Sequence, residues 1–324
     1  MTRQQTIPVV DLQDFASGDA SRRARFVRDL GDAFVEFGFV AVENHGVDPA
    51  AVADTYATIR RFFALPTEAK ARYEIPGGAG QRGYASFGRE HAKNSSVADL
   101  KEFWHVGPEL PDGHPLLTRM APNVWPEEVP QFQDAALRLC KSLDHTGAQL
   151  LRALACYLDA DEDAFAHMID GGNSILRLIR YPGPDEVEPE PGAVWAAAHE
   201  DINLITLLVE ATDPGLELLR RDGDWMPIVP IPGQLIADAG DMLQHLTNGR
   251  IPSTTHRVLA PADARGPRYS MPYFLHPHPD CMLEPLPSCI TAARPRQWDG
   301  ISAERYLYQR LAEIGLVEAP ELLD

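Results

Sequence analysis

The spacing of apolar positions changes about halfway along the chain. In the first half the apolar residues recur mostly at helical intervals, which predicts helices over residues 20–36, 49–63 and 130–158. From Ser174 onward, short runs of apolar and β-branched residues are separated by turns rich in Pro and Gly. That second pattern is typical of strands.

The second half contains further signals for strands and turns. Residues 202–209 are largely β-branched and apolar and predict a buried strand, and Arg-Asp-Gly-Asp at 221–224 predicts a hairpin turn. The last strong strand of the core is expected to end at 271–274, and 302–314 predicts a closing helix. Helices followed by short strands favour an α+β fold, a double-stranded β-helix (jelly-roll) core with N-terminal supporting helices and a C-terminal helix.

The length of 324 residues suits one such core with its supporting helices. We therefore expect residues 1–324 to form a single catalytic unit. Within it, 1–173 is expected to be a mainly helical region with opening strands, 174–290 the jelly-roll core that holds any metal site, and 291–324 a C-terminal helical segment.

Composition narrows the possible partners. The formal net charge of −18 argues against a nucleic-acid partner, because phosphate contacts require clustered Lys and Arg. No stretch approaches the ~18 apolar residues of a membrane span, and the N-terminus lacks the apolar core of a signal peptide. The four cysteines show no C-x-x-C spacing. We expect a cytoplasmic protein with reduced cysteines and no membrane contact, as a monomer or a weak homo-oligomer.

Three residues have the chemistry of a metal site. His199 and Asp201 are two positions apart, so on a strand their side chains would point to the same face, and His256 follows much later in a Ser-Thr-Thr-His run. Two imidazoles and one carboxylate can hold non-haem Fe(II) and leave other coordination positions open. The alternative is that each is a structural polar residue of the sheet. The ligand types also leave zinc, cobalt or nickel open.

Arg268 and Ser270 form a candidate carboxylate-binding pair. The planar guanidinium of arginine matches two carboxylate oxygens, and the serine hydroxyl adds a further donor. On a strand the two side chains would point the same way, toward the metal cavity. The alternative is a surface arginine paired with an acidic residue.

The chain resembles the isopenicillin N synthase-like branch of the iron and 2-oxoglutarate-dependent oxygenases. The similarity runs through nearly the whole chain, and several motifs in one order are more specific than any single motif. Besides the triad and Arg-x-Ser, the segments that carry it are Ile7–Leu12, Gly38–Gly46 (similar to "GFF-x-V-x-NHG"), Phe62–Pro66, Leu178–Pro182, Gly240–Gln244 and Leu246–Gly249.

The resemblance implies an activity and its cofactors. It implies that His199, Asp201 and His256 bind Fe(II), and that 2-oxoglutarate pairs its far carboxylate with Arg268 and Ser270. Oxygen and a small-molecule substrate complete the reaction, most simply a hydroxylation that releases succinate and CO2. In the family a tyrosine at the position of Tyr181 commonly donates its hydroxyl to the same carboxylate.

The resemblance leaves two alternatives. The local Leu-Ile-Arg-Tyr-Pro, with Ile179 where plant enzymes usually carry Asn, is similar to isopenicillin N synthase itself, an oxidase that uses no 2-oxoglutarate. The C-terminus argues against that enzyme, because it lacks the glutamine of its relatives. A non-catalytic binding protein on the same barrel is disfavoured by the intact triad, and halogenation is disfavoured by the presence of Asp201.

Other histidines and one long segment have open roles. Three roles are open for His245, namely lining the pocket, contacting a metal ligand, or packing at the end of a strand, and His276 and His278 are interpreted as loop residues. Residues 74–126 are rich in Gly, Pro and small polar residues and show few regular patterns, so they are either a lid over the barrel mouth or a rigid connection. Within them, substrate contact and ordinary packing are equally open for Arg82, Tyr84, Phe103 and Trp104.

Overall fold

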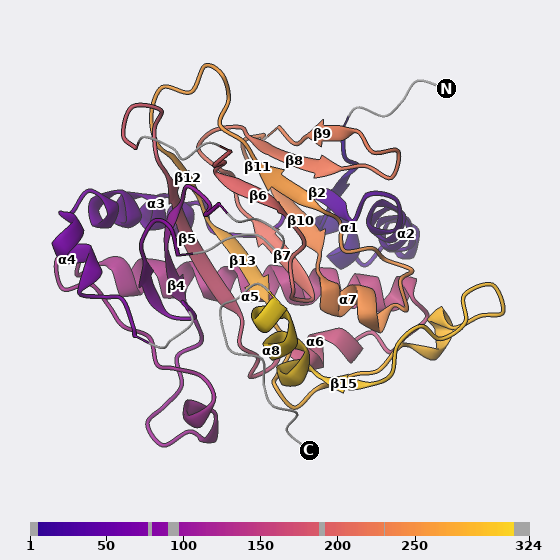
Figure 1. Ribbon diagram of the computed structural model, residues 1–324. Helices are drawn as coiled ribbons and strands as arrows, with labels where there is room; N and C mark the ends of the chain where they lie inside the picture. Colours follow the sequence, from indigo (N-terminus) through magenta and orange to yellow (C-terminus); the bar gives the residue numbers. More distant parts are fainter. Residues whose placement is uncertain (1–5, 77–79, 90–96, 188–191, 230, 314–324) are drawn as a thin grey trace.

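The computed structural model describes residues 6–76, 80–89, 97–187, 192–229 and 231–313. Two β-sheets form its centre, and the helices lie mainly against the larger sheet (Figure 1). Among the described residues, the larger sheet has the strand order β1-β2-β10-β7-β13-β5-β4-β3, and β12 also pairs with β5. Its strands are β1 (Val9–Asp11), β2 (Phe39–Glu43), β3 (Gly83–Ala85), β4 (Glu102–Val106), β5 (Ile175–Tyr181), β7 (Ile205–Leu208), β10 (Leu235–Ala239), β12 (Arg268–Ser270) and β13 (Pro272–Leu275).

The smaller sheet has the order β6-β11-β8-β9. It consists of β6 (Ala196–His199), β8 (Leu216–Leu219), β9 (Trp225–Pro227) and β11 (His256–Val258), and a separate pair is formed by β14 (Met282–Leu283) and β15 (Ile301–Ser302). Side chains from both main sheets line one shared cavity. This arrangement confirms the expected α+β fold with a jelly-roll core.

Long helices support the outer face of the larger sheet (Figure 1). The helices are α1 (Gln13–Ala16), α2 (Ala20–Phe37), α3 (Pro49–Phe63), α4 (Thr67–Ala71), α5 (Phe132–Tyr157), α6 (Ala164–Ile169), α7 (Asp241–Leu246) and α8 (Ala303–Glu313), with 3₁₀ turns at Pro115–Thr118 and Pro287–Cys289. Helix α5 lies close to β13 at Gly147, where an added Cβ would collide with the side chain of Leu275. The glycine lets this helix approach the sheet without displacing the Leu275 side chain.

Local sequence signals explain where the first helices begin and end. Asp19 accepts hydrogen bonds from the first turn of α2, and Gly38 ends that helix in the left-handed region at φ 69°. Asp48 caps α3, whose first residue is Pro49. The helices predicted over 20–36, 49–63 and 130–158 are thus confirmed with small shifts at their ends, and the hairpin at 221–224 joins β8 to β9.

Residues 74–126 contain two short strands, β3 and β4, that the sequence pattern did not predict. β4 is a fully buried strand that pairs with both β3 and β5. The sequence did not indicate this strand, because Glu102 is a charged residue and a buried position is expected to be apolar. In the structure, ion pairs with Lys70 and Arg180 compensate the charge of Glu102. β3 and β4 therefore belong to the sheet and not to a lid. Residues 77–79 and 90–96, on which much of the lid expectation falls, lie outside the described residues.

Two further expectations about strands are corrected. The strand predicted over 202–209 begins only at Ile205, because the carbonyls of Asp201, Ile202 and Asn203 accept hydrogen bonds from the first N–H groups of α7. His245 lies in α7 and not at the end of a strand. The last core strand is divided at Met271 into β12 and β13.

Within the described residues, no helix is both long enough and apolar enough to cross a membrane. All four cysteines are free thiols, and Cys140 and Cys156 lie in α5.

Candidate active site

The smaller sheet and the segment that follows β6 bring His199, Asp201 and His256 together. His199 ends β6 and His256 begins β11, and the two are direct cross-strand partners. Their ring centroids lie 4.4 Å apart. Asp201 follows in the irregular segment, where its carbonyl oxygen accepts a 2.7 Å hydrogen bond from the Asp241 N–H at the start of α7. One ligand atom from each of the three side chains lies within 4.8 Å of the others.

Backbone carbonyls fix the tautomers of both imidazoles. Nδ1 of His199 lies 2.7 Å from the Ala197 carbonyl oxygen, and Nδ1 of His256 lies 3.2 Å from that of Thr254. A carbonyl oxygen only accepts, so each Nδ1 carries the hydrogen and each Nε2 keeps its lone pair. Both Nε2 atoms stand 3.9 Å from Asp201 Oδ1. The three donors therefore converge on one point, as a metal requires.

The protonation states suit a metal site. Burial, followed by the neighbouring His256, lowers the pKa of His199 to about 4, so the ring is neutral near pH 7. Burial alone would raise the pKa of Asp201, but the imidazoles of His256 and His199 and the Thr206 hydroxyl outweigh it, so the pKa lies below its usual value. Neutral imidazoles and an ionised carboxylate are the forms that ligate metals.

A second buried carboxyl lies beside the triad and was not foreseen. Burial, and then the charge of Asp201, raise the pKa of Asp238 well above its usual value, which favours the protonated form of this carboxyl. Asp238 is hydrogen-bonded to Asp201 and to Thr206, which is its cross-strand partner in β7. Thr206 also donates a hydrogen bond to Asp201 Oδ2. Thr206 and Asp238 thus orient the carboxylate of Asp201.

Arg268 lies in the same cavity and is held in position by its neighbours. Arg268 and Ser270 both lie on β12, and Arg268 is the cross-strand partner of Tyr181 on β5. Its Cζ lies 5.0 Å from the Tyr181 ring centroid, and its Nε donates to the Asp213 carbonyl at 2.9 Å. Nη1 is buried and has no hydrogen-bond partner among the described residues. A buried donor of this kind is costly unless a ligand accepts from it.

The cavity is narrow, with a volume of about 60 Å³. It is lined by all three candidate ligands, by Arg268, Ser270 and Tyr181, and also by Lys101 and Arg177. The sequence analysis did not single out Lys101 or Arg177. The alternation along β5 could have indicated Arg177, because it shares a face with Tyr181.

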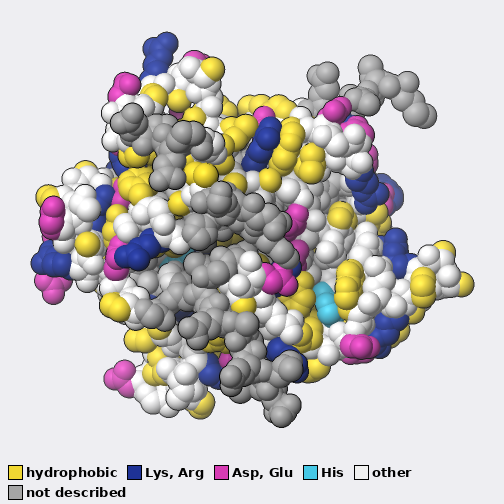
Figure 2. Space-filling view, in the orientation of Figure 1, with side chains coloured by type: hydrophobic (Ala, Val, Ile, Leu, Met, Phe, Trp, Pro, Cys, Tyr) yellow, Lys and Arg dark blue, Asp and Glu magenta, His cyan; other side chains and the backbone are white. Residues whose placement is uncertain are grey.

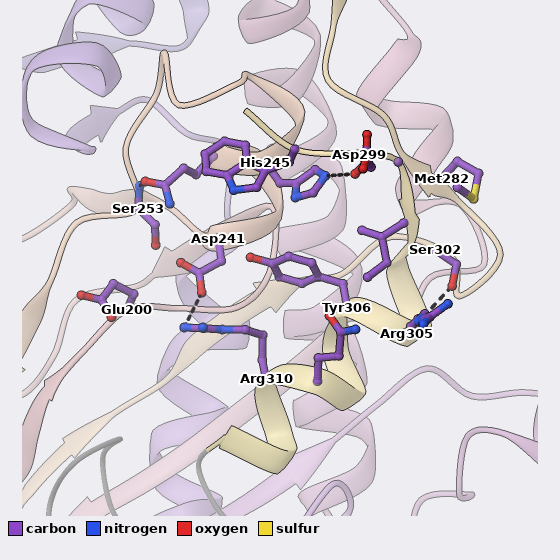
Figure 3. A pocket seen from close by; sticks show the side chains of 15 residues that line it. Glu200, Asp241, His245, Ser253, Met282, Asp299, Ser302, Arg305, Tyr306 and Arg310 are labelled. Atoms are coloured by element: carbon purple, nitrogen blue, oxygen red, sulfur yellow. Dashed lines mark hydrogen bonds and ion pairs between the residues drawn. The ribbon is translucent and has the colours of Figure 1, made fainter. Parts of the chain in front are cut away.

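The weaker histidine candidates lie elsewhere. His245 Nε2 lies 3.0 Å from the Asp299 carbonyl oxygen and its ring stacks on Trp298, in a surface pocket between α7 and α8 (Figure 3). His276 and His278 follow β13 in a loop, as expected. His276 is buried, and this burial lowers its pKa to about 4.

The substrate-facing candidates in 74–126 divide into two groups. Trp104 is fully buried and packs edge-on against Phe62, while Tyr84 donates its hydroxyl to Glu102. Arg82 donates to Asn173 Oδ1 in the interior. These three residues are part of the packed interior. Phe103 lies on the cavity side of β4, where Arg177 stacks on its ring.

The residues present fit a metal and an anionic co-substrate. A set of two histidines and one carboxylate with open positions is the ligand set of non-haem Fe(II) oxygenases. The buried, unpartnered Nη1 of Arg268 supplies the donor that a carboxylate in the same cavity would need. Fold and site together define the class of jelly-roll iron oxygenases.

Comparisons with known proteins identify the family. Residues 7–128 match the N-terminal model of non-haem dioxygenases of morphine synthesis, and residues 172–277 match the 2OG-Fe(II) oxygenase superfamily. A 2-oxoglutarate-dependent dioxygenase, frbJ, from Dothideomycetidae sp. is 30% identical over 93% of this chain and 81% of its own.

Similar solved structures indicate the same family. A Caulobacter crescentus protein assigned to the 2OG-Fe(II) oxygenase family is 42% identical over 96% of this chain and all of its own, with a TM-score of 0.86. A full-length Neurospora crassa protein solved in complex with alpha-KG is 30% identical over 96% of this chain and 98% of its own, with a TM-score of 0.84.

The chain belongs to the 2OG-Fe(II) oxygenase superfamily. It is an enzyme that uses Fe(II), 2-oxoglutarate and O2 to oxidise a small molecule. These findings support the 2-oxoglutarate-dependent interpretation over the oxidase similar to isopenicillin N synthase.

Proposed function

We propose that His199, Asp201 and His256 hold the Fe(II), and that Arg268, Ser270 and Tyr181 hold the far carboxylate of 2-oxoglutarate. One observation carries the proposal: the Nε2 atoms of both histidines lie 3.9 Å from Asp201 Oδ1 in the same cavity as the buried Nη1 of Arg268, which has no hydrogen-bond partner among the described residues. When bound, Fe(II) supplies the redox chemistry that couples substrate oxidation to the conversion of 2-oxoglutarate and O2 into succinate and CO2.

The protein's own residues orient the reactants. The Ala197 and Thr254 carbonyls keep the Nε2 atoms of both histidines available for the metal. Thr206 and Asp238 hold the carboxylate of Asp201 by hydrogen bonds. Elsewhere in the cavity, the Asp213 carbonyl and the ring of Tyr181 fix the guanidinium of Arg268. The guanidinium therefore loses little rotational freedom when a carboxylate binds.

The proposed reaction is hydroxylation of a small molecule. A C–H bond of the substrate becomes C–OH, with one oxygen atom of O2 entering the product and the other entering succinate. Two relatives support this choice. A proline hydroxylase, buaE, from Petromyces alliaceus is 29% identical over 94% of this chain, and the Neurospora crassa protein was also solved with alpha-KG and thymine. Thymine is therefore a reasonable first probe.

The test is turnover by the Fe(II)-loaded enzyme and by two ligand variants. We expect succinate to form from 2-oxoglutarate with wild-type protein, and Asp201→Ala and His256→Ala to abolish it while the circular dichroism spectrum is retained. Thymine and other small molecules are then screened for a gain of one oxygen by mass spectrometry. Full succinate production by either variant with added Fe(II) would remove the metal assignment.

We also propose that 1–324 acts as one cytoplasmic catalytic unit, a monomer or weak homo-oligomer without nucleic-acid or membrane partners. The single-unit proposal is supported by a hydrophobic core that joins α2, α3 and α5 to the larger sheet. The four free cysteines suit a reducing compartment. On the face shown in Figure 2, the described Lys and Arg side chains are scattered among acidic ones. Light scattering of the protein alone tests the oligomeric state. The same measurement with added DNA tests the proposal that the protein has no nucleic-acid partner.

A further inference from the structure

A surface pocket with a volume of about 840 Å³ lies between α7 and α8. Its lining includes Glu200, which stands between the candidate ligands His199 and Asp201 in the sequence. Helix α8 contributes Tyr306 and Arg310 to the same lining (Figure 3). The segment that carries two candidate metal ligands and the C-terminal helix are therefore walls of one pocket.

The first residue of α7 is tied directly to Asp201. The N–H of Asp241 donates a 2.7 Å hydrogen bond to the carbonyl oxygen of Asp201. Ser253 contacts both residues, because its hydroxyl lies 3.5 Å from the same carbonyl oxygen and is hydrogen-bonded to the Asp241 carboxyl. A shift of Asp241 would therefore be transmitted to the backbone that carries the Asp201 carboxylate.

Arg310 holds the side chain of Asp241. Its Nη2 lies 2.9 Å from Asp241 Oδ2, and the two side chains point toward one another from α8 and α7 (Figure 3). The contact is an ion pair without an aligned hydrogen bond, since Oδ2 has no hydrogen-bond partner among the described residues. The Asp241 side chain is 6% exposed and that of Arg310 is 24% exposed, so salt screens this pair less than a surface pair.

Helix α8 is attached separately at its two ends. At its start, Glu304 forms a 2.7 Å ion pair with Arg119. In its last turn, Leu311 is buried and Arg310 pairs with Asp241. Loss of the second ion pair would therefore loosen the last turn of α8 while its first turn stays attached.

We propose that Arg310 is a positioning residue for the metal site: its ion pair with Asp241 docks the last turn of α8, fixes the start of α7 and so holds Asp201 where Fe(II) binds. The inference rests on the proposed function, because it takes Asp201 as a metal ligand. Coupling between two equilibria is reciprocal, so the docked form of α8 is more stable in the Fe(II)-bound protein. An ion pair that only adds stability would show no such dependence on the metal.

The first measurement is amide hydrogen exchange of the complete protein, with and without Fe(II), under anaerobic conditions. We expect Fe(II) to slow exchange in residues 303–313 of wild-type protein, because metal binding and helix docking stabilise each other. The effect of Fe(II) should be lost in Arg310→Met. The wild-type comparison requires no variant, so it tests the inference even if Arg310→Met folds poorly.

The second measurement is Fe(II) affinity by competition with a chelator. Arg310→Met and Asp241→Asn should each bind Fe(II) about 5-fold or more weakly than wild-type protein. The double variant should bind no more weakly than either single variant, because both substitutions remove the same ion pair. Arg310→Lys should keep part of the affinity, since it keeps the charge. Arg305→Met is the matched control and should bind as wild-type protein does, because Arg305 lines the same pocket from the same helix but does not pair with Asp241.

These measurements separate a failure of the proposed function from a failure of this inference. Wild-type protein that binds no Fe(II) would contradict the proposed function and, with it, the role of Arg310. Fe(II) binding that leaves exchange in residues 303–313 unchanged would overturn the present inference alone. Equal Fe(II) affinity in Arg310→Met and wild-type protein, or an equal loss in Arg305→Met, would also overturn it.

Discussion

Arg268 and Tyr181 are direct partners on neighbouring strands, and the guanidinium carbon lies 5.0 Å from the centre of the phenol ring. The pair closes one end of the cavity that contains His199, Asp201 and His256. A carboxylate that binds there meets a cation already oriented by stacking, which lowers the entropy lost on binding.

Arg268→Ala should raise the apparent KM for 2-oxoglutarate while Fe(II) binding stays the same. Removing a charged partner from a buried pair costs about 2–5 kcal/mol, which corresponds to roughly 30-fold to several thousand-fold. The measurement is succinate formation as a function of 2-oxoglutarate concentration. Arg257→Ala is the matched control, because Arg257 pairs with Glu217 and stacks on Trp225. An equal change in both variants would reject Arg268 as the anchor.

Tyr181→Phe separates the hydroxyl group from the ring. If the hydroxyl donates to the co-substrate, its loss should weaken 2-oxoglutarate binding by about 0.5–1.5 kcal/mol, or roughly 2- to 12-fold. Tyr181→Leu should weaken it further, because the surface on which Arg268 stacks is also lost. Unchanged affinity in Tyr181→Phe, together with a loss in Tyr181→Leu, would limit the role of Tyr181 to stacking.

Asp238 should act through Asp201. Burial and the charge of Asp201 raise the pKa of the Asp238 carboxyl and so favour its protonated form, which can donate a hydrogen bond that an asparagine amide can replace. We expect Asp238→Asn to bind Fe(II) nearly as tightly as wild-type protein, and Asp238→Ala to lose about 10- to 100-fold in affinity. Competition with a chelator measures this difference. An equal loss in both variants would show that the carboxyl acts in some other way than as a neutral donor.

His276 should make the metal-free protein less stable in weak acid. Burial depresses the pKa of His276 from 6.5 to about 4, so between these values the unfolded chain binds a proton that the folded protein does not. The free energy of unfolding should therefore be unaffected by this group above pH 6.5 and decrease as the pH falls toward 4, by about 3 kcal/mol at most.

The measurement for His276 is urea unfolding between about pH 7.5 and 4.5, a range that includes the unfolded-state pKa of 6.5 and most of the interval down to about 4. Carboxyl groups and His199 titrate in the same window, so the quantity of interest is the difference between wild-type protein and His276→Leu. The variant should lose less stability across this range. Parallel curves for the two proteins would reject the assignment to His276.

Much of the fold could be predicted because local signals agreed with the final structure. Asp19 and Gly38 mark the ends of α2, and Asp48 with Pro49 marks the start of α3. The strand β4 could not be predicted in this way, because its charged residues are neutralised by partners far away in the sequence, such as Lys70 for Glu102. Tertiary pairing, and not periodicity, decides that segment.

The site likewise has a part that the sequence predicted and a part that only the folded structure shows. Residue types and order predicted the triad, and the structure brings its three members together. The reason given for the first pair was wrong, since Asp201 lies beyond the end of β6 and is positioned by the N-terminus of α7. Asp238 could not be assigned from sequence, because its raised pKa depends on burial and on the charge of Asp201, which only the folded chain provides.

The central claim is that one cavity holds Fe(II) on the triad and 2-oxoglutarate between that metal and Arg268. Anaerobic titration of the protein with Fe(II) and then 2-oxoglutarate, followed by visible absorption, tests it most directly. We predict a metal-to-ligand charge-transfer band that needs both additions, is absent in Asp201→Ala, and requires far more 2-oxoglutarate in Arg268→Ala. A wild-type protein that binds Fe(II) but shows no band at saturating 2-oxoglutarate would contradict the account.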